Sequence, residues 1–319
     1  MIQYKIERDN VLGIRQCDYL GDNYQPGYVS LYNYNNIELF PFTRCCFSIG
    51  DWGIVSALPR ILKELNPNLQ VYIPTPNWIR SVFPNVNGWK YQDIDPSKSV
   101  ELVFANNPYV QYFDMGDFTS VFNDHDRCNR FNNEPLAKRI LRNFGVNEQI
   151  ISKLDVRPEL YFSEEEQYIG NQIINRYVDN NRYGCILLAS RLEHLNNCWD
   201  INIPSIQNLL VEVRKLSLDK DFKFFYYSSF DITKTYWADV FNITEHNFIN
   251  FANIKDCPLR IQWYIKSKAA YNISYQSGFN DCVSRYSKHL VATHREGTGE
   301  TTCQYVKYFK PDGSIVINT

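Results

Sequence analysis

The 319-residue chain lacks several features that would assign it to a special class of protein. No Cys-x-x-Cys pair occurs among its nine cysteines, so their spacing indicates neither a zinc cluster nor a disulfide framework. No apolar run approaches the roughly 20 residues that a membrane span needs. Residues 1–20 mix charged and apolar positions and lack the apolar centre of a signal peptide. These absences predict a cytoplasmic protein with reduced thiols and no transmembrane segment.

The chain also has little excess of either charge. Its 33 Lys and Arg residues against 35 Asp and Glu residues give a net charge of -2 at pH 7, and the pI is near 6.2. Broad electrostatic binding to nucleic acid is therefore not expected. Hydrophobic residues make up 44% and charged residues 21% of the chain, as in ordinary globular proteins. A chain of this length usually forms two domains, each large enough to bury its own core.

Apolar runs of strand length alternate with helical patterns from residue 44 onward. In the first half, strands are predicted at 45–49, 69–73 and 100–105, and a helix is predicted to begin near Ser56, which can cap it and leave Pro59 in the first turn. The later strands are predicted at 185–189, 222–227, 271–275 and 290–293, and the helices at 134–145, 164–178, 205–216 and 259–269. This succession predicts an α/β protein with doubly wound parallel sheets. Residues 1–43 have short extended pieces broken by turns, and predict a β-rich addition.

Two loops, one in each half, lie where a predicted strand gives way to a helix. The first contains Gly50 and Asp51, and the second contains Ser277 and Gly278. A strand that ends at glycine and continues as a helix leaves unpaired N–H groups at one point, which can bind an anion or place a reactive carboxylate. Two such loops indicate a two-domain enzyme with a cleft.

Four motifs, in this order, resemble the heptosyltransferase-like glycosyltransferases of the GT-B fold, which build bacterial surface saccharides. They are the Gly-Asp loop and helix at 49–59, the stretch Arg157-Pro158-Glu159-Leu160 with Ser163-Glu164-Glu165-Glu166, the stretch 187–191 with Trp199, and the final motif 276–281. The resemblance covers roughly residues 44–310 and implies two Rossmann-like domains. Residues 44–157 would then bind the acceptor and residues 158–319 the nucleotide-sugar donor, with residues 1–43 as the β-rich addition packed on the first domain.

The final motif departs from the family pattern. Gln276 replaces an aspartate and Asp281 replaces a histidine, at positions that touch the donor in relatives. The chain also begins well before the Gly-Asp loop, whereas family members usually start there. Two interpretations of the altered motif remain open, namely a donor other than ADP-heptose and a loss of activity.

Asp51 is the residue that the resemblance implies as catalytic. Inverting sugar transfer needs a carboxylate that removes the proton of the acceptor hydroxyl. Considered without the family, an aspartate at a helix start is more often a cap. The other acceptor-binding residues implied are Gly50, Trp52, His125 and Arg127. The aromatics Trp78, Tyr109 and Tyr112 could stack on a sugar or base, although most aromatics in such domains are core residues.

The donor-binding residues implied by the resemblance are Ser190, Arg191, Gln276, Ser277, Gly278 and Asp281. Ser277 and Gly278 would receive the diphosphate, because glycine allows close approach and a helix start donates hydrogen bonds. Arg191 would neutralise the leaving diphosphate, with Ser190 assisting. Asp281 would repel phosphate and instead hold a sugar hydroxyl. The alternative for these residues is an ordinary turn and a solvent-exposed arginine.

The sequence gives weak support for a metal or cofactor. Asp124-His125-Asp126 and Asp93-Ile94-Asp95 have no further ligands at suitable spacing, and both are interpreted as surface turns. The predicted function is therefore metal-independent transfer of a sugar, with inversion, from a nucleotide-diphosphate sugar to a hydroxyl acceptor, presumed a saccharide. The alternatives are transfer to a hydroxymethylated DNA base, disfavoured by the acid pI, and a catalytically idle relative that binds a nucleotide or glycan.

Overall fold

A computed structural model gives the fold of the chain over twelve stretches. These are residues 38–44, 49–82, 94–118, 122–124, 136–143, 146–178, 182–188, 192–244, 246–275, 285–286, 288–292 and 307–317. The chain divides between Tyr161 and Phe162 into two compact units. We call them the first and second units and describe each by itself. Residues 158–161, expected to begin the donor domain, group with the first unit.

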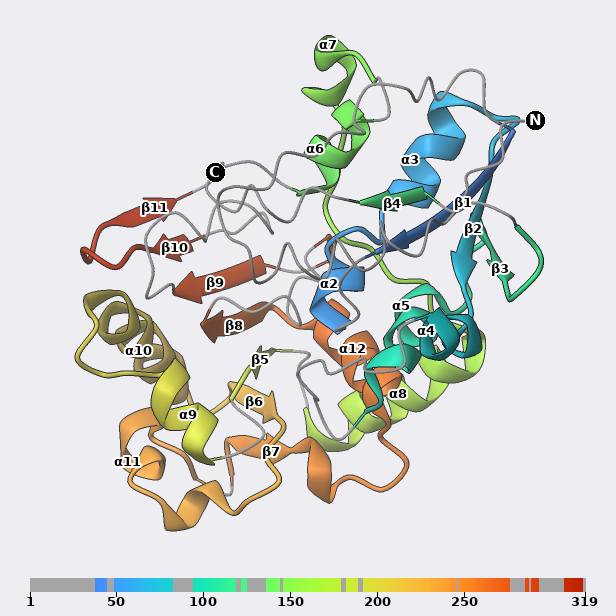
Figure 1. Cartoon of the computed structure of the whole chain (residues 1–319). Helices are drawn as coiled ribbons and strands as arrows, with labels where there is room; N and C mark the ends of the chain where they lie inside the picture. The colour runs from blue at the N-terminus through green and yellow to red at the C-terminus, as the bar shows by residue number, and fades with distance from the viewer. Residues whose placement is uncertain are drawn as a thin grey trace. The chain divides into compact units, whose positions relative to one another are not determined.

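The first unit contains a four-stranded parallel sheet with the order β3-β2-β1-β4 (Figure 1). Its strands are β1 (Leu39–Arg44), β2 (Gln70–Pro74), β3 (Val110–Phe113) and β4 (Phe122–Asp124). Phe40 of β1 lies opposite Val71 of β2, and Phe42 lies opposite Phe122 of β4. Phe40 and Phe42 are buried, so β1 runs through the core of this unit.

The helices of the first unit follow its strands along the chain. They are α2 (Ile49–Gly53), α3 (Leu58–Leu65), α4 (Pro76–Val82), the 3-10 helix η3 (Pro96–Lys98), α5 (Ser99–Phe104), α6 (Leu136–Asn143) and α7 (Glu148–Ile151). In α3 the buried residues Leu58, Ile61 and Leu62 recur at helical spacing. Pro59 lies in its first turn, where a missing N–H costs nothing.

The second unit contains a seven-stranded sheet with the order β11-β10-β9-β8-β5-β6-β7. Its strands are β5 (Tyr183–Ile186), β6 (Lys223–Tyr226), β7 (Phe248–Asn250), β8 (Tyr271–Tyr275), β9 (Lys288–Ala292), β10 (Lys307–Phe309) and β11 (Ile315–Ile317). All pair in parallel except β10 with β11, which form an antiparallel hairpin. Gly313 in the turn of this hairpin has a φ of +86°, which favours glycine.

Helices pack against both faces of the second sheet. They are α8 (Glu164–Tyr177), α9 (Leu192–Cys198), α10 (Pro204–Ser217), the 3-10 helices η5 (Ile232–Lys234) and η6 (Phe251–Asn253), α11 (Trp237–Phe241) and α12 (Leu259–Lys268). Phe224 belongs to a core cluster with residues of α10, whereas its neighbour Phe225 belongs to a cluster with residues of α8 and α12. Successive strand residues point to opposite faces, so two cores sandwich this sheet.

Helices α8 and α12 of the second unit approach each other closely. A Cβ atom at Gly170 of α8 would lie 2.2 Å from Cδ1 of Tyr264 of α12. Glycine is therefore required at this point of contact.

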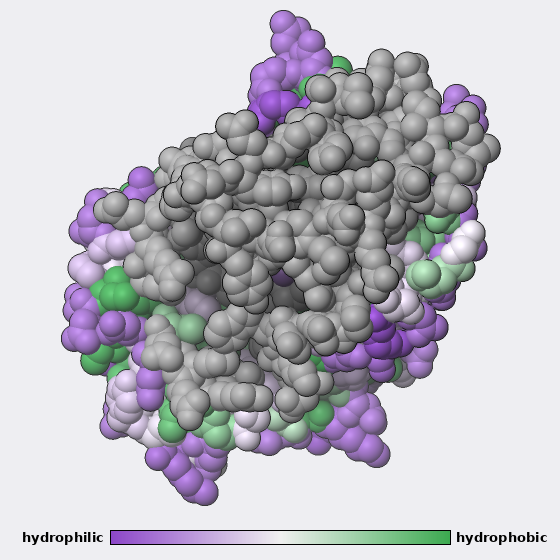
Figure 2. All heavy atoms as spheres, viewed as in Figure 1, coloured by the Kyte–Doolittle hydropathy of each residue, from purple (hydrophilic) through white to green (hydrophobic). Residues whose placement is uncertain are grey.

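Among the described residues, no helix has the length and apolar character needed to cross a membrane. In Figure 2 many of the coloured residues around the edge of the view are hydrophilic.

The mixed α/β fold with parallel sheets confirms the predicted class, and several elements lie where they were expected. Strand β8 covers the predicted residues 271–275, and α8, α10 and α12 match their predicted helices within two residues. Most of the expected N-terminal addition, residues 1–37, lies outside the described residues. The last residues of that stretch, 39–43, form part of β1 and so belong to the first sheet.

Two predicted strands of the first unit have a different outcome. Of the strand expected at 45–49, residues 45–48 lie outside the described residues and Ile49 lies in α2, while the described strand before this helix is Leu39–Arg44. The strand expected at 100–105 is the helix α5. Its buried residues Val100, Val103 and Phe104 have helical spacing, and Asp95 caps the 3-10 turn directly before it. A short apolar run fitted either structure, and this local cap decides for the helix.

Candidate functional site

The candidate catalytic loop lies beyond the carboxyl end of β1. Asp51 is in the first turn of α2 and is half-buried, as is Gly50. The next residue, Trp52, has an exposed fraction of 0%. Its indole makes edge contacts with Phe42, at 6.2 Å between ring centroids, and with Phe104, at 5.9 Å. Trp52 thus anchors α2 to the core, while Asp51 stays partly accessible.

This burial corrects the expectation that Trp52 meets the acceptor. The side chain is enclosed by the core and presents no surface to a ligand. Trp78 is also buried, against Phe113, whereas Tyr112 is 41% exposed. A sequence motif that places tryptophan beside Asp51 cannot by itself show which way the ring points.

Ser56 has a different partner from the one expected. Helix α3 begins after Ala57 without a side-chain cap. The hydroxyl oxygen of Ser56 instead accepts a hydrogen bond from the backbone N–H of Glu159, at 2.8 Å. The expectation that Ser56 caps the helix is therefore wrong, because the helix starts two residues later and the hydroxyl is buried against a distant segment.

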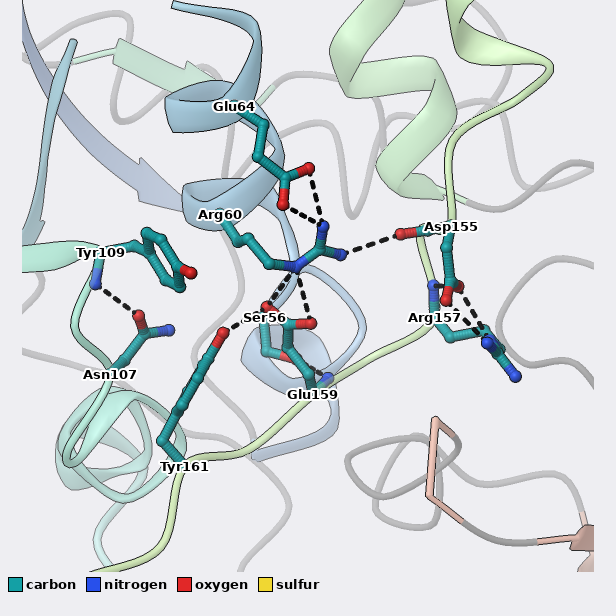
Figure 3. Close-up of polar contacts among 9 residues, drawn as sticks. All are labelled: Ser56, Arg60, Glu64, Asn107, Tyr109, Asp155, Arg157, Glu159 and Tyr161. Carbon is teal, nitrogen blue, oxygen red and sulfur yellow. Dashed lines mark hydrogen bonds and ion pairs between the residues drawn. The ribbon is translucent and has the colours of Figure 1, made fainter. Parts of the chain in front are cut away.

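A polar cluster surrounds Glu159 in the first unit (Figure 3). Arg60 Nε donates to both carboxylate oxygens of Glu159 at 3.0 Å, and the Tyr161 hydroxyl donates to one of them at 2.9 Å. The same guanidinium donates to Glu64 at 2.9 and 3.0 Å and to the carbonyl of Asp155 at 3.1 Å. Burial lowers the pKa of Arg60, but the hydrogen bond with Glu64 and the charge of Glu159 outweigh it and raise the pKa overall. Arg60 therefore stays charged.

The second unit contains a cavity of about 650 Å³ next to strands β6 and β7. Tyr226 ends β6 and Asn250 ends β7, and the residues that follow each strand line the cavity, among them Ser228, Phe230 and Asn253. In α/β proteins, ligands bind outside the carboxyl ends of parallel strands. The cavity therefore lies at the carboxyl ends of the strands, beside β6 and β7, whereas the strand order reverses between β5 and β8.

Asn250 holds the two lining loops together. Its Oδ1 accepts hydrogen bonds from the N–H groups of Ser228 at 3.2 Å and Ala252 at 3.0 Å, and its Nδ2 donates to the carbonyl of Ser228 at 3.0 Å. The Ser228 hydroxyl donates in turn to the carbonyl of Phe230 at 2.8 Å. These bonds make the wall of the cavity a fixed surface.

Among the described residues that line the cavity, Asp231 is the only charged one. It pairs with Lys234 at 3.1 Å, and a hydrogen bond from Thr233 helps to lower its pKa. Burial, with the nearby Asp231 charge, raises the pKa of Tyr226 to about 12, so this phenol stays neutral. A neutral lining with hydrogen-bonding groups suits an uncharged ring better than a phosphate.

The predicted donor residues all fall outside the described residues, as do the acceptor residues His125 and Arg127. Those donor residues are Ser190, Arg191, Gln276, Ser277, Gly278 and Asp281. The strands that lead to them are described. Strand β5 pairs in parallel with β8, so these two strands end on the same side of the sheet.

Trp199 is buried between the ends of these two strands. Its indole N–H donates to the carbonyl of Leu187 at 3.2 Å, and its ring makes an edge contact with Tyr275 at 6.1 Å. Trp199 belongs to one of the four sequence motifs, which imply no role for it, and its contacts indicate that it supports the strand ends.

The two Asp-x-Asp segments are partly described. Asp95 caps η3 by accepting from the N–H of Ser97 and pairs with Arg80 at 3.4 Å. Asp124 lies in β4, opposite Arg44, so the expectation of a surface turn there is wrong. Asp93, His125 and Asp126 lie outside the described residues. Within the described stretches, no three His, Cys, Asp or Glu residues are grouped to share a metal ion.

Comparison with known proteins gives a similarity in fold. The sequence matches no family model and no curated protein. The structure is similar to the crystal structure of the glycosyl transferase family 9 from Veillonella parvula DSM 2008, with a TM-score of 0.51 and 10% sequence identity. The likeness covers 87% of this chain and 86% of that chain, so it concerns the general fold of both units.

Proposed function

We propose that this chain is a glycosyltransferase of the GT-B fold, with two Rossmann-like domains, that moves a sugar from a nucleotide-diphosphate sugar to a hydroxyl group of a saccharide with inversion. The observation that carries the proposal is the similarity in fold to a family 9 glycosyltransferase over most of both chains. The Gly50-Asp51 loop adds a carboxylate at a strand-to-helix junction, as this chemistry needs. The proposal includes the heptosyltransferase-like type that the sequence motifs resemble.

Asp51 would act as the general base toward the acceptor hydroxyl. The carboxylate is carried by α2, and the neighbouring Trp52 packs this helix against the core. A base held in this way removes the proton as the sugar carbon is attacked. Gly50, His125 and Arg127 are proposed as acceptor contacts.

The donor would bind in the second unit. The cavity beside β6 and β7 would receive the nucleoside, since its lining is neutral apart from Asp231. The diphosphate would lie against Ser277, Gly278 and Arg191, and the remaining donor contacts proposed are Ser190, Gln276 and Asp281. Arg191 and the N–H groups would stabilise the leaving diphosphate without a metal or other cofactor.

Thermal-shift screening of nucleoside diphosphates and their sugars would test the proposal. A ligand present at about 100 times its Kd stabilises the fold by roughly 2.7 kcal/mol. We expect at least one nucleotide sugar to raise the melting temperature, and the same compound to be consumed when a saccharide acceptor is added. Stabilisation without consumption would identify an idle nucleotide-binding relative. The absence of any stabilisation by the full set would contradict donor binding.

A further inference from the structure

Glu159 connects the turn after α2, and helix α3, to residues 159–161 of the first unit. Its N–H donates to the Ser56 hydroxyl, its carboxylate accepts from Arg60, and it also accepts from the hydroxyl of Tyr161. Its exposed fraction is only 2%, and a buried carboxylate is tolerated only when it is paired and hydrogen-bonded. We propose that Glu159 is a positioning residue, which fixes the place where the chain leaves the first unit relative to Asp51.

The connection from Asp51 to Ser56 is short and hydrogen-bonded. The N–H of Ile54 donates to the carbonyl of Gly50 at 3.1 Å, and the N–H of Ser56 donates to the carbonyl of Gly53 at 3.1 Å. Ser56 is fully buried. A displacement of Ser56 is therefore passed to the turn of α2 that holds Asp51.

Tyr161 continues the connection to the end of the first unit. Besides its hydrogen bond to Glu159, its ring makes an edge contact with Tyr109, at 6.0 Å between centroids. The intervening residue Leu160 is 2% exposed. Backbone and side chains thus remain anchored up to Tyr161.

The next residue is anchored in the second unit. The guanidinium of Arg260 lies 5.3 Å from the centroid of the Phe162 ring, and Tyr264 makes an edge contact with the same ring at 5.4 Å. Arg260 also donates to both carboxylate oxygens of Glu166. Glu166 in turn forms a capping box with Ser163 at the start of α8.

Tyr161 and Phe162 are consecutive residues, yet they are held by different units. In this stretch, a pivot is confined to the backbone torsions between them. Contacts of the Tyr161 and Phe162 side chains hold the chain on both sides of this peptide bond. Glu159 holds the chain on the first-unit side of this pivot, and Asp51 belongs to the same unit. Its effect on sugar transfer rests on the proposed function, whereas its effect on the chain at 160–162 does not.

Chymotrypsin provides a direct test, because it cleaves after large apolar and aromatic residues and the pivot contains Leu160, Tyr161 and Phe162. Under native conditions we expect the wild-type chain to resist cleavage there. Glu159→Gln should raise the rate of cleavage at these residues by tenfold or more, since the charged pair with Arg60 is lost. Glu148→Gln is the matched control, because Glu148 also pairs with an arginine of the first unit, Arg142, but lies on the surface.

Tyr161→Phe provides a milder variant if Glu159→Gln does not fold. It removes only the hydroxyl that donates to Glu159 and keeps the site for chymotrypsin, so faster cleavage is again expected. Cleavage at 160–162 that is equally slow in both folded variants and in wild type would overturn the inference. Rapid cleavage there in wild type would overturn it as well.

A second readout separates this inference from the proposed function. With the donor found by thermal shift, Glu159→Gln should lower kcat by tenfold or more and leave the KM for the donor unchanged, since the donor binds in the other unit. An unchanged kcat in a variant that is cleaved faster would overturn the link to Asp51. If wild type consumes no nucleotide sugar, the proposed function fails, and the cleavage rates still decide whether Glu159 holds the pivot.

Discussion

Trp199 donates its indole N–H to the backbone carbonyl of Leu187, at an N–O distance of 3.2 Å. Leu187 follows β5, and the Trp199 ring also contacts Tyr275 at the end of β8. One buried side chain therefore fixes the two strand ends that lead to the proposed diphosphate site.

We expect Trp199→Phe to reduce the free energy of unfolding by about 1–3 kcal/mol, because it leaves the buried Leu187 carbonyl without its donor. Urea unfolding would measure this change. Trp237→Phe is a suitable control, since Trp237 is equally buried and donates to Asn196 at 2.8 Å. Both variants should be destabilised, but only Trp199→Phe should weaken binding of the nucleotide sugar. Equal affinity of the two variants for the nucleotide sugar would contradict a role of Trp199 at the strand ends.

Asp51→Asn should abolish most sugar transfer and leave donor binding nearly intact. Removal of a general base typically costs a factor of 100 to 10,000, or about 3 to 5 kcal/mol of barrier. Single-turnover rates and calorimetric donor affinity would separate the two effects. Asp239→Asn, which changes another first-turn aspartate on the short helix α11, should keep the wild-type rate. Full activity in Asp51→Asn would reduce Asp51 to a helix-start residue.

The cavity beside β6 and β7 should depend on Asn250. Asn250→Ala removes the two hydrogen bonds that join the lining loops and the one that caps η6. We expect affinity for the nucleoside diphosphate to fall by about tenfold, equivalent to about 1.4 kcal/mol. Calorimetry well below the melting temperature would measure it. Asn202→Ala, at an exposed turn where Asn202 bonds only to Asp200 among its described hydrogen bonds, is the comparison. Wild-type affinity in the cavity variant would place the nucleoside elsewhere.

The Arg260–Glu166 pair predicts a dependence of stability on pH. Burial raises the pKa of Glu166, but hydrogen bonds from Arg260 and from the N–H of Ser163 outweigh it and hold the pKa below its ordinary value of 4.5. The stabilisation is thus fully present above pH 4.5 and is lost as the pH falls through the folded pKa.

Unfolding free energies measured between pH 7 and pH 3 would test this dependence. The difference in unfolding free energy between wild type and Glu166→Gln should be constant above pH 4.5 and should become smaller at lower pH. Glu165→Gln changes the exposed neighbouring glutamate and should follow the wild-type curve. A gap that does not change with pH would exclude the proposed contribution of the ionised Glu166.

Transfer should persist after chelation. In the proposed mechanism the leaving diphosphate is met by Arg191 and backbone N–H groups rather than by a cation. Turnover with excess EDTA should equal turnover with added Mg²⁺ or Mn²⁺. Turnover that strictly requires a metal, and that is lost in Asp124→Asn, would refute both the metal-free mechanism and the assigned donor site.

The helices and strands of the second unit were predicted from the sequence more accurately than those of the first. Its strands β5, β6 and β8 are short, mostly buried and separated by long helices such as α10 and α12, so the spacing of apolar residues and the length of each element agree. In the first unit, residues 100–105 fitted either structure, and the contacts that select the helix come from the cap at Asp95 and from Trp52. The Asp95 cap lies close by in the sequence, whereas the contact with Trp52 comes from a distant part of the chain that a local pattern does not show.

The candidate site was predictable only in part. The Gly50-Asp51 junction was recognisable, because glycine and a carboxylate mark it in the sequence. Glu159 was not, since its partners Ser56 and Arg60 are 103 and 99 residues away in the chain. Asn250 was missed for a similar reason, as its role appears only when β6 and β7 bring two loops together. The roles of Arg191, Ser277 and Gly278 stay predictions.

The strand order of the second sheet has a consequence for synthesis of the chain. From β8, the strands β9, β10 and β11 are added outward in the order in which they leave the ribosome. Until residues 307–309 have emerged, β9 presents an unpaired edge to other nascent chains, and an unpaired strand edge promotes aggregation. A chain stopped before β10 should therefore depend on chaperones, whereas one that includes the hairpin should not.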